Sequence, residues 1–377
     1  VNTAAPAGDQ VLYLGLLGAS RGIIFLLYIT LGGAIADRYP RRTVVIISSL
    51  STVGLLLLVD LLLWIPAIGG STDTVIVVAL IGLFATFGLS TAQDQPTRTS
   101  MVRDAVPDHL LGGGIALFQL AQGAMVMAAA PLAGILIDRF GIPTTYLVGV
   151  LGPVAVVLLI RRLPRDIGAS DPDAATVSLI DNLRGGFSVI RDDPVVRWTV
   201  LLSWITTMLG LSILGVLVAA WASEVLGLDA SGWGRMIFFW GFGSFVAATY
   251  LSTREIRRHR GWFFLGSSFV FSLAVIGFSL SREMPLVYFF NALNGGAFIA
   301  FTIAGLAIVQ NTVPNRVLGR VTGLLLLGQG LMQVFALLVS VVARAVGLEA
   351  VFLGIAITML GTTTLVAAVQ HPLRSFD

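Results

Sequence analysis

The stretch TVVIISSLSTVGLLLLVDLLLWIP, residues 43–66, contains a single charged residue, Asp60. About 20 apolar residues in a helix suffice to cross the hydrocarbon core of a bilayer, so this stretch predicts one membrane-spanning helix. The whole chain has the same character: 56% of its 377 residues are hydrophobic and 11% are charged, whereas a soluble domain carries roughly 25% charged residues. A soluble enzyme, a disordered chain and a nucleic-acid-binding protein are therefore poor descriptions of it, and the small net charge of +3 agrees.

Ten further stretches resemble this one in length and composition. They lie at about residues 11–36, 74–93, 112–136, 143–160, 199–221, 233–252, 262–280, 285–310, 321–343 and 349–370. Backbone polar groups in hydrocarbon must be satisfied within the chain, and none of these runs shows the alternation of barrel strands, so we expect helices. The predicted fold class is an all-α polytopic membrane protein.

Five of the eleven predicted spans precede a long polar stretch and six follow it, which indicates a design of six plus six helices that lacks its first helix. The chain begins with Val1, in agreement with this expectation, and a genuine eleven-span protein is the alternative. The expected domains are an N-terminal membrane bundle (residues 1–160), a linker with an amphipathic helix (161–198) and a C-terminal membrane bundle (199–377).

The placement of Arg predicts the orientation in the membrane. Of the 23 Arg residues, 18 lie in the C-terminal tail or in the loops at about 37–42, 94–111, 161–198, 253–261 and 311–320. Short loops rich in basic residues stay on the cytoplasmic side. These segments and the C-terminus are therefore expected in the cytoplasm, and residue 1 outside it.

Two segments of the chain resemble each other. VPDHLLGGGIALFQLAQG, residues 106–123, matches VPNRVLGRVTGLLLLGQG, residues 313–330, in register at Val, Pro, Leu, Gly and the Gln-Gly pair. Matched helices that run in the same direction indicate parallel repeats related by an axis along the membrane normal, with a binding site between the halves. The alternative is chance similarity between apolar helices.

The loop GGAIADRYPRR, residues 32–42, joins the first two predicted spans. An Asp at the end of one helix, followed by three Arg, can form an electrostatic latch, in which Asp37 accepts hydrogen bonds from the N-terminus of the helix that starts near Arg320. The expected gating residues are Asp37, Arg38, Arg41, Arg42, Asp94 and Arg98, with Asp94 paired to Arg38 and Arg98 paired to Asp37. The alternative, which we favour for Arg41 and Arg42, is that these charges only anchor helices at the membrane surface.

The spacing of Gly33, Asp37, Arg38, Arg41 and Arg42 resembles the GxxxDRxxRR signature loop of the major facilitator superfamily. AQDQPTRTSMV (residues 92–102) and DNLRGGFSVIRDDPVVR (181–197) are similar to the branch that holds the enterobactin exporter and macrolide efflux proteins. The resemblance implies a secondary active transporter of the bacterial plasma membrane that exports an amphipathic, siderophore- or macrolide-like molecule in exchange for protons. Pro40 departs from the Gly that is usual in this loop.

Arg21, Asp60 and Arg235 are charged residues that lie inside the predicted spans. Arg21 is about ten residues, or roughly 15 Å, from the end of its helix, so we expect it in a cavity, where it binds an anionic group of the substrate or holds a carboxylate. Contact with backbone carbonyls is the alternative. The proton-coupling residue is expected to be Asp94 or Asp60, to lie on the missing helix, or not to exist; Asp60 can also reach the membrane surface.

Uncharged polar side chains share helix faces, as expected for the lining of a cavity. Gln119 and Gln122 are three residues apart, and Gln329 and Gln333 are four apart on the matching helix. The expected substrate-binding residues are Arg21, Gln119, Gln122, Trp204, Asn291, Asn294, Gln329 and Gln333. The alternative for each amide is a hydrogen bond that joins two helices.

Other features limit the remaining function classes. The chain has no Cys and three scattered His, so we expect no metal site, and it shows no phosphate-binding loop, so we expect no cofactor and no nucleotide-driven transport. The expected partners are a small amphipathic substrate, protons and membrane lipid. A transporter-like scaffold or assembly subunit of a larger membrane complex is the alternative function, because a transporter fold does not guarantee transport.

Overall fold

The computed structural model describes residues 10–38, 40–64, 72–107, 111–163, 179–253 and 259–376. All regular elements within these ranges are helices, which confirms the all-α prediction. The elements are α1 (Gln10–Arg38), α2 (Arg41–Trp64), α3 (Thr72–Ala105), α4 (Leu111–Arg162), α5 (Leu179–Asp192), α6 (Pro194–Leu211), η3 (Ser212–Leu217), α7 (Val218–Ala220), η4 (Trp221–Val225), α8 (Ala230–Thr253), α9 (Arg260–Leu280), α10 (Met284–Thr312), α11 (Asn315–Val346), α12 (Leu348–Val369) and α13 (His371–Arg374).

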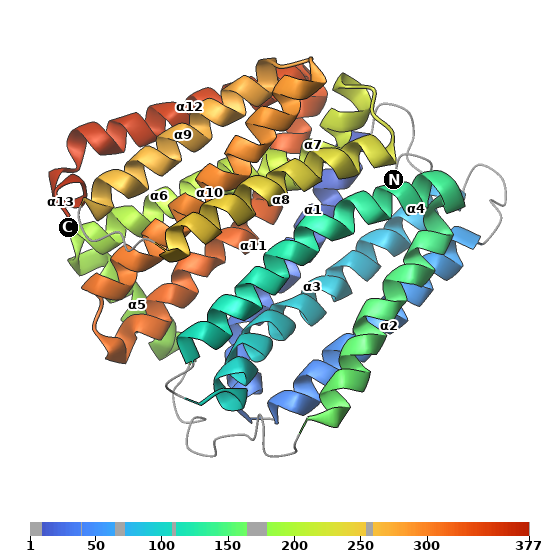
Figure 1. Cartoon of the computed structure of the whole chain (residues 1–377), viewed down its shortest axis with the longest axis horizontal. Helices are drawn as coiled ribbons and strands as arrows, with labels where there is room; N and C mark the ends of the chain where they lie inside the picture. Colours follow the sequence, from blue (N-terminus) through green and yellow to red (C-terminus); the bar gives the residue numbers. More distant parts are fainter. Residues whose placement is uncertain are drawn as a thin grey trace.

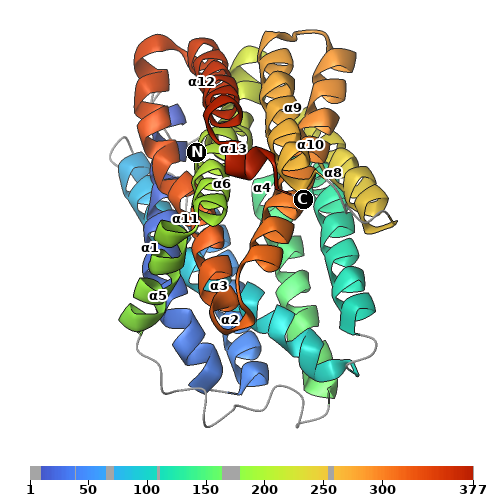
Figure 2. The ribbon, with the colours of Figure 1, turned by 90° about the vertical axis from the view of Figure 1, so that its left-hand side faces the viewer.

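The helices form two groups that lie side by side along a common direction (Figure 1). The N-terminal group is α1–α4 and the C-terminal group is α6–α12, with α5 packed against α11. Figure 2, seen from the side that carries α13, shows the two groups one above the other. The term linker end is used here for the end of the molecule where α2 and α6 begin. The term far end is used for the opposite end, where α1 and α8 begin.

Seven helical segments of the described residues are long and apolar enough to span a membrane. Two shorter apolar stretches, Val11–Leu27 of α1 and Leu80–Ser90 of α3, accompany them. The protein is therefore a multi-pass membrane protein. The count of eleven spans, the six-plus-six design and the domain bounds stay predictions.

A glycine divides α4 into two arms. Gly141 has φ 81° and ψ 168°, a left-handed conformation that side chains other than hydrogen rarely tolerate. The predicted spans at 112–136 and 143–160 fall on the two sides of this break. Both arms expose large apolar side chains, among them Leu117 and Leu151, as expected of helices that face lipid.

Aromatic packing holds the far end of the C-terminal group together. The indole of Trp221 stacks on the ring of Phe352 with the centroids 4.3 Å apart. The guanidinium of Arg282 lies 5.3 Å from the Trp221 ring and is paired with Glu349 at 2.7 Å. The chain between α6 and Trp221 is partly π-helical over η3, a distortion often found where a helix lines a functional site.

Candidate functional site

Two long helix pairs join the groups: α1 packs along α11, and α4 packs along α8. In the α1–α11 seam, a Cβ added to Gly22 would lie 2.7 Å from the Cβ of Gln333. In the α4–α8 seam, a Cβ added to Gly234 would lie 2.6 Å from the carbonyl oxygen of Ala130. Glycines therefore permit close contact between the groups at both seams.

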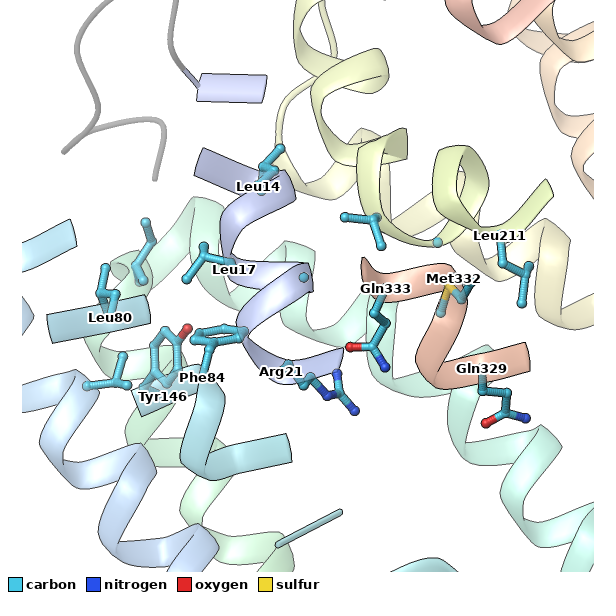
Figure 3. A pocket seen from close by; sticks show the side chains of 15 residues that line it. Leu14, Leu17, Arg21, Leu80, Phe84, Tyr146, Leu211, Gln329, Met332 and Gln333 are labelled. Carbon is cyan, nitrogen blue, oxygen red and sulfur yellow. The ribbon is translucent and has the colours of Figure 1, made fainter. Parts of the chain in front are cut away.

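A cavity of about 580 Å³ lies between the groups, beside the α1–α11 seam (Figure 3). Side chains from α1, α2, α3 and α4 line it on one side, and residues of α6, η3 and α11 line it on the other. The described polar lining residues are Arg21, Tyr146, Gln329 and Gln333, and the apolar ones include Leu17, Val59, Phe84, Leu211, Val216 and Met332. One solute in this cavity would touch both groups.

Arg21 is the only charged side chain among the described lining residues. Its guanidinium carbon lies 5.0 Å from the centroid of the Phe87 ring, which gives a cation–π contact. The Nε atom is buried and has no hydrogen-bond partner among the described residues. A buried donor of this kind is costly unless an acceptor reaches it, so the site suits a ligand with an anionic or strongly accepting group.

Two predicted amides join Arg21 in the cavity. Gln329 is exposed to it, whereas Gln333 is nearly buried, with 9% of its surface exposed. Figure 3 shows the Gln333 amide beside Arg21, on the opposite wall. Both Gln belong to α11, four residues apart, so the predicted shared face is the face that α11 presents to the cavity.

The remaining predicted binding residues lie elsewhere. Trp204 donates its Nε1–H to the carbonyl oxygen of Leu324 at 2.8 Å, and so joins α6 to α11. Asn291 is buried and donates to the carbonyl oxygen of Met236, which joins α10 to α8. Asn294 is buried within the same group, Gln122 is exposed on α4, and the side chain of Gln119 lies outside the described residues.

Asp94 and Asp60, two acidic residues of the N-terminal group, occupy different places. Asp94 forms a 2.6 Å ion pair with Arg98, four residues on, and accepts a hydrogen bond from Ser48. Both charged residues line a second pocket, of about 340 Å³, together with Ser49, Thr52, Phe87 and Ser90. Asp60 is 7% exposed, its Oδ1 has no hydrogen-bond partner among the described residues, and its neighbour Val59 lines the central cavity.

The predicted gating loop is described only in part. The side chains of Asp37 and Arg38 lie outside the described residues. Arg42 donates to the carbonyl oxygens of Leu163 and Arg161 at 2.9 and 2.8 Å, so it caps the C-terminal end of α4. Arg41, at the first position of α2, is partly buried.

Tyr146 and Phe84 were not among the predicted binding residues. Tyr146 is amphipathic and Phe84 is apolar, and both lie within long apolar runs. In such a run, residue spacing does not distinguish a helix face that lines a cavity from one that faces lipid. The break at Gly141 was the available signal, because a second arm that folds back from it brings Tyr146 to the cavity.

Comparison with known proteins identifies the architecture. The family model described as the Major Facilitator Superfamily matches residues 8–337. The niacin transporter NiaP of Acinetobacter baylyi is 25% identical over 169 residues, which is 44% of this chain and 33% of that protein. The alignment therefore spans about a third of that relative's length.

Solved transporter structures have the same fold. The human organic anion transporter MFSD10 is 18% identical with a TM-score of 0.65, over 93% of this chain and 83% of that chain. The nucleoside transporter NupG is 13% identical with a TM-score of 0.71, over 94% and 90%. A D-xylose–proton symporter is 13% identical with a TM-score of 0.70, over 95% and 89%. The exporter branch stays a prediction.

Proposed function

Since the chain belongs to the major facilitator superfamily, we propose that it is a proton-coupled secondary transporter that exports a small amphipathic molecule with an anionic group. The substrate binds in the cavity between the two groups, and the groups rock about their seams so that the cavity opens at one end and then at the other. The linker end faces the cytoplasm of a bacterium. The direction of transport follows the resemblance of residues 92–102 and 181–197 to exporters.

The position of Arg21 carries this proposal. A guanidinium inside a membrane protein is costly, and Phe87 compensates only part of its charge, because a cation–π contact contributes roughly 0.5–2 kcal/mol. A substrate carboxylate would supply both the missing charge and an acceptor for the unpaired Nε. The relative named as a niacin transporter supports a carboxylate substrate, since niacin is an aromatic carboxylic acid.

The rest of the lining favours an amphipathic substrate. The amides of Gln329 and Gln333 and the hydroxyl of Tyr146 offer uncharged hydrogen bonds, whereas Phe84 and Met332 offer apolar surface. The volume of about 580 Å³ lies within the range of small-molecule sites, which is roughly 300–1,000 Å³. Because the lining comes from both groups, substrate binding favours their closure around it.

Proton coupling needs a carboxylate whose protonation differs between the two access states. Asp60 is buried next to the cavity wall, and Asp94 lines the second pocket, which Phe87 also lines. We assign coupling to these two residues. Asp37 and Arg38 close the linker end, where the Asp94–Arg98 pair lies, and Asp37→Asn should abolish transport while the protein still folds.

A matched pair of solutes tests the charge requirement. Nicotinate and nicotinamide have nearly the same shape and differ in charge, so binding to the purified protein and uptake into inverted vesicles with an imposed proton gradient should favour nicotinate. Arg21→Gln should lower nicotinate binding at least tenfold and remove the preference, and Arg21→Lys should restore part of it. Arg344→Gln, on an exposed residue at the far end of α11, serves as the control.

Equal binding of both solutes to the wild type and to Arg21→Gln would remove the anionic-substrate assignment. A transport rate that does not depend on the imposed proton gradient would contradict the assignment of proton coupling to Asp60 and Asp94. Absence of any transport across a wider panel, with folded protein, would favour the scaffold function.

A further inference from the structure

A carboxylate of the N-terminal group contacts the first turn of a helix in the C-terminal group at the far end. Asp138 of α4 accepts a hydrogen bond on Oδ2 from the backbone N–H of Ser231, the second residue of α8, at 2.8 Å. Asp229 accepts from the next N–H, that of Gly232, at 2.7 Å. The first N–H groups of a helix have no acceptor within it and carry partial positive charge. Asp138 therefore supplies, from the other group, an acceptor that α8 lacks.

The backbone before Asp138 allows α4 to come close enough to α8 for this contact. A Cβ added to Gly134, one turn before Asp138, would lie 2.5 Å from the carbonyl oxygen of Ala230. Because Gly134 has no side chain, α4 reaches the start of α8 at backbone distance. The hydrogen bond from Gly232 also holds the pKa of Asp229 below its ordinary value, so that Asp229 caps its own helix as a carboxylate.

The sequence around Asp138 repeats the pattern of the predicted gating loop. GILIDRF, residues 134–140, and GAIADRY, residues 33–39, share a Gly, three apolar residues, Asp, Arg and an aromatic residue in the same order. The first ends an arm of α4 at the far end, just before Gly141, and residues 33–38 of the second end α1 at the linker end. In the α1–α11 seam, α1 ends where α11 begins, and in the α4–α8 seam the first arm of α4 ends where α8 begins.

We propose that Asp138 is a positioning residue of the gate at the far end: its hydrogen bond to the N-terminus of α8 holds the two groups together there and breaks when the groups rock open at that end. This inference rests on the proposed alternating-access transport. It assigns to the far end a counterpart of the Asp37 latch at the linker end. Asp138 touches no substrate, so its removal changes the balance between the two access states and leaves the binding contacts in place.

The absence of Cys from the chain makes a direct measurement possible. Spin labels on introduced cysteines at Phe140 of α4 and Glu283 at the start of α10, both exposed at the far end, report the separation of the groups there by pulsed electron paramagnetic resonance. Asp138→Ala should raise the fraction of long distances at least threefold in the substrate-free full-length protein. Asp138→Asn keeps an uncharged acceptor and should give an intermediate fraction.

Glu349→Gln is the matched control. Glu349 is also a carboxylate at the far end, but its partner Arg282 belongs to the same group, so its loss should leave the distances unchanged. The latch assignment would be overturned if Asp138→Ala gave the same distance distribution as the wild type. It would also be overturned if Glu349→Gln shifted the distribution as much as Asp138→Ala does. The readout needs no substrate, so failure of the latch and failure of the anionic-substrate assignment are distinguishable.

Discussion

The two seams between the groups differ in what the glycines meet. In the α1–α11 seam, Gly22 faces the Cβ of Gln333 and the carbonyl oxygen of Gly330, but Gly330 itself faces the end of the Leu26 side chain. In the α4–α8 seam, Gly134 and Gly234 face backbone atoms of the opposite helix. Side chains can change rotamer when a neighbour moves, whereas backbone atoms in a helix cannot. The α1–α11 seam, which adjoins the cavity, is therefore suited to adjust to a substrate. The α4–α8 seam has no side chain at these glycines that can yield, so it stays closed or separates as a whole, as the proposed Asp138 latch requires.

The strongest test of this difference is Gly234→Val in the α4–α8 seam. The new Cβ would lie 2.6 Å from the carbonyl oxygen of Ala130, so the helices must separate. Overpacking of this kind costs about 3 kcal/mol or more when the neighbour cannot move. We expect a large fall in the thermal unfolding temperature in detergent, and loss of transport.

Gly361→Val provides the comparison for Gly234→Val. Gly361 lies in α12, and a Cβ added to it would have no neighbouring atom within 4 Å, so this variant carries the same change in helix propensity without a clash. An equal loss of stability in both variants would show that the loss comes from the change in helix propensity and not from a clash in the α4–α8 seam.

Gly330→Val should have a smaller effect on stability and a specific effect on binding. Its nearest contacts are the Cδ2 of Leu26 and the ring of Phe25, side-chain ends that can move away, so we expect a cost of about 1–2 kcal/mol in unfolding free energy. Phe25 lies one turn after Arg21 on α1, so its displacement should weaken nicotinate binding severalfold. Titration calorimetry beside thermal unfolding separates the two effects. Destabilisation as large as in Gly234→Val, with unchanged binding, would contradict the assigned difference between the seams.

The membrane-spanning character could be predicted from the sequence, because the hydropathy of a helix indicates directly whether lipid or water surrounds it. Arg21 stood out for the same reason, as a charge inside a span. The shared face of Gln329 and Gln333 also lies on the cavity wall. Asn291 and Asn294 have similar spacing, yet they are buried inside the C-terminal group. Spacing shows that two residues share a face, but only packing decides what that face meets.

Asp138 was missed for a different reason. A charge at the end of a predicted span satisfies the topology rules by itself, so it gave no reason to look for a partner. Its partner is a backbone N–H of a helix 93 residues further along the chain, and backbone groups leave no mark in a sequence. The available signal was the repeated Gly–x–x–x–Asp–Arg pattern at residues 33–38 and 134–139.

The finest test compares two amides on the same helix. Gln333 is nearly buried at the seam beside Arg21, whereas Gln329 is exposed in the cavity, where water can replace its hydrogen bonds. A buried hydrogen bond contributes roughly 0.5–1.5 kcal/mol, so Gln333→Leu should weaken nicotinate binding about fivefold, and Gln329→Leu should change it less than twofold. Dissociation constants from titration calorimetry at fixed pH measure both. Equal effects would mean that the α1–α11 seam does not take part in binding, and that the substrate lies in the open part of the cavity.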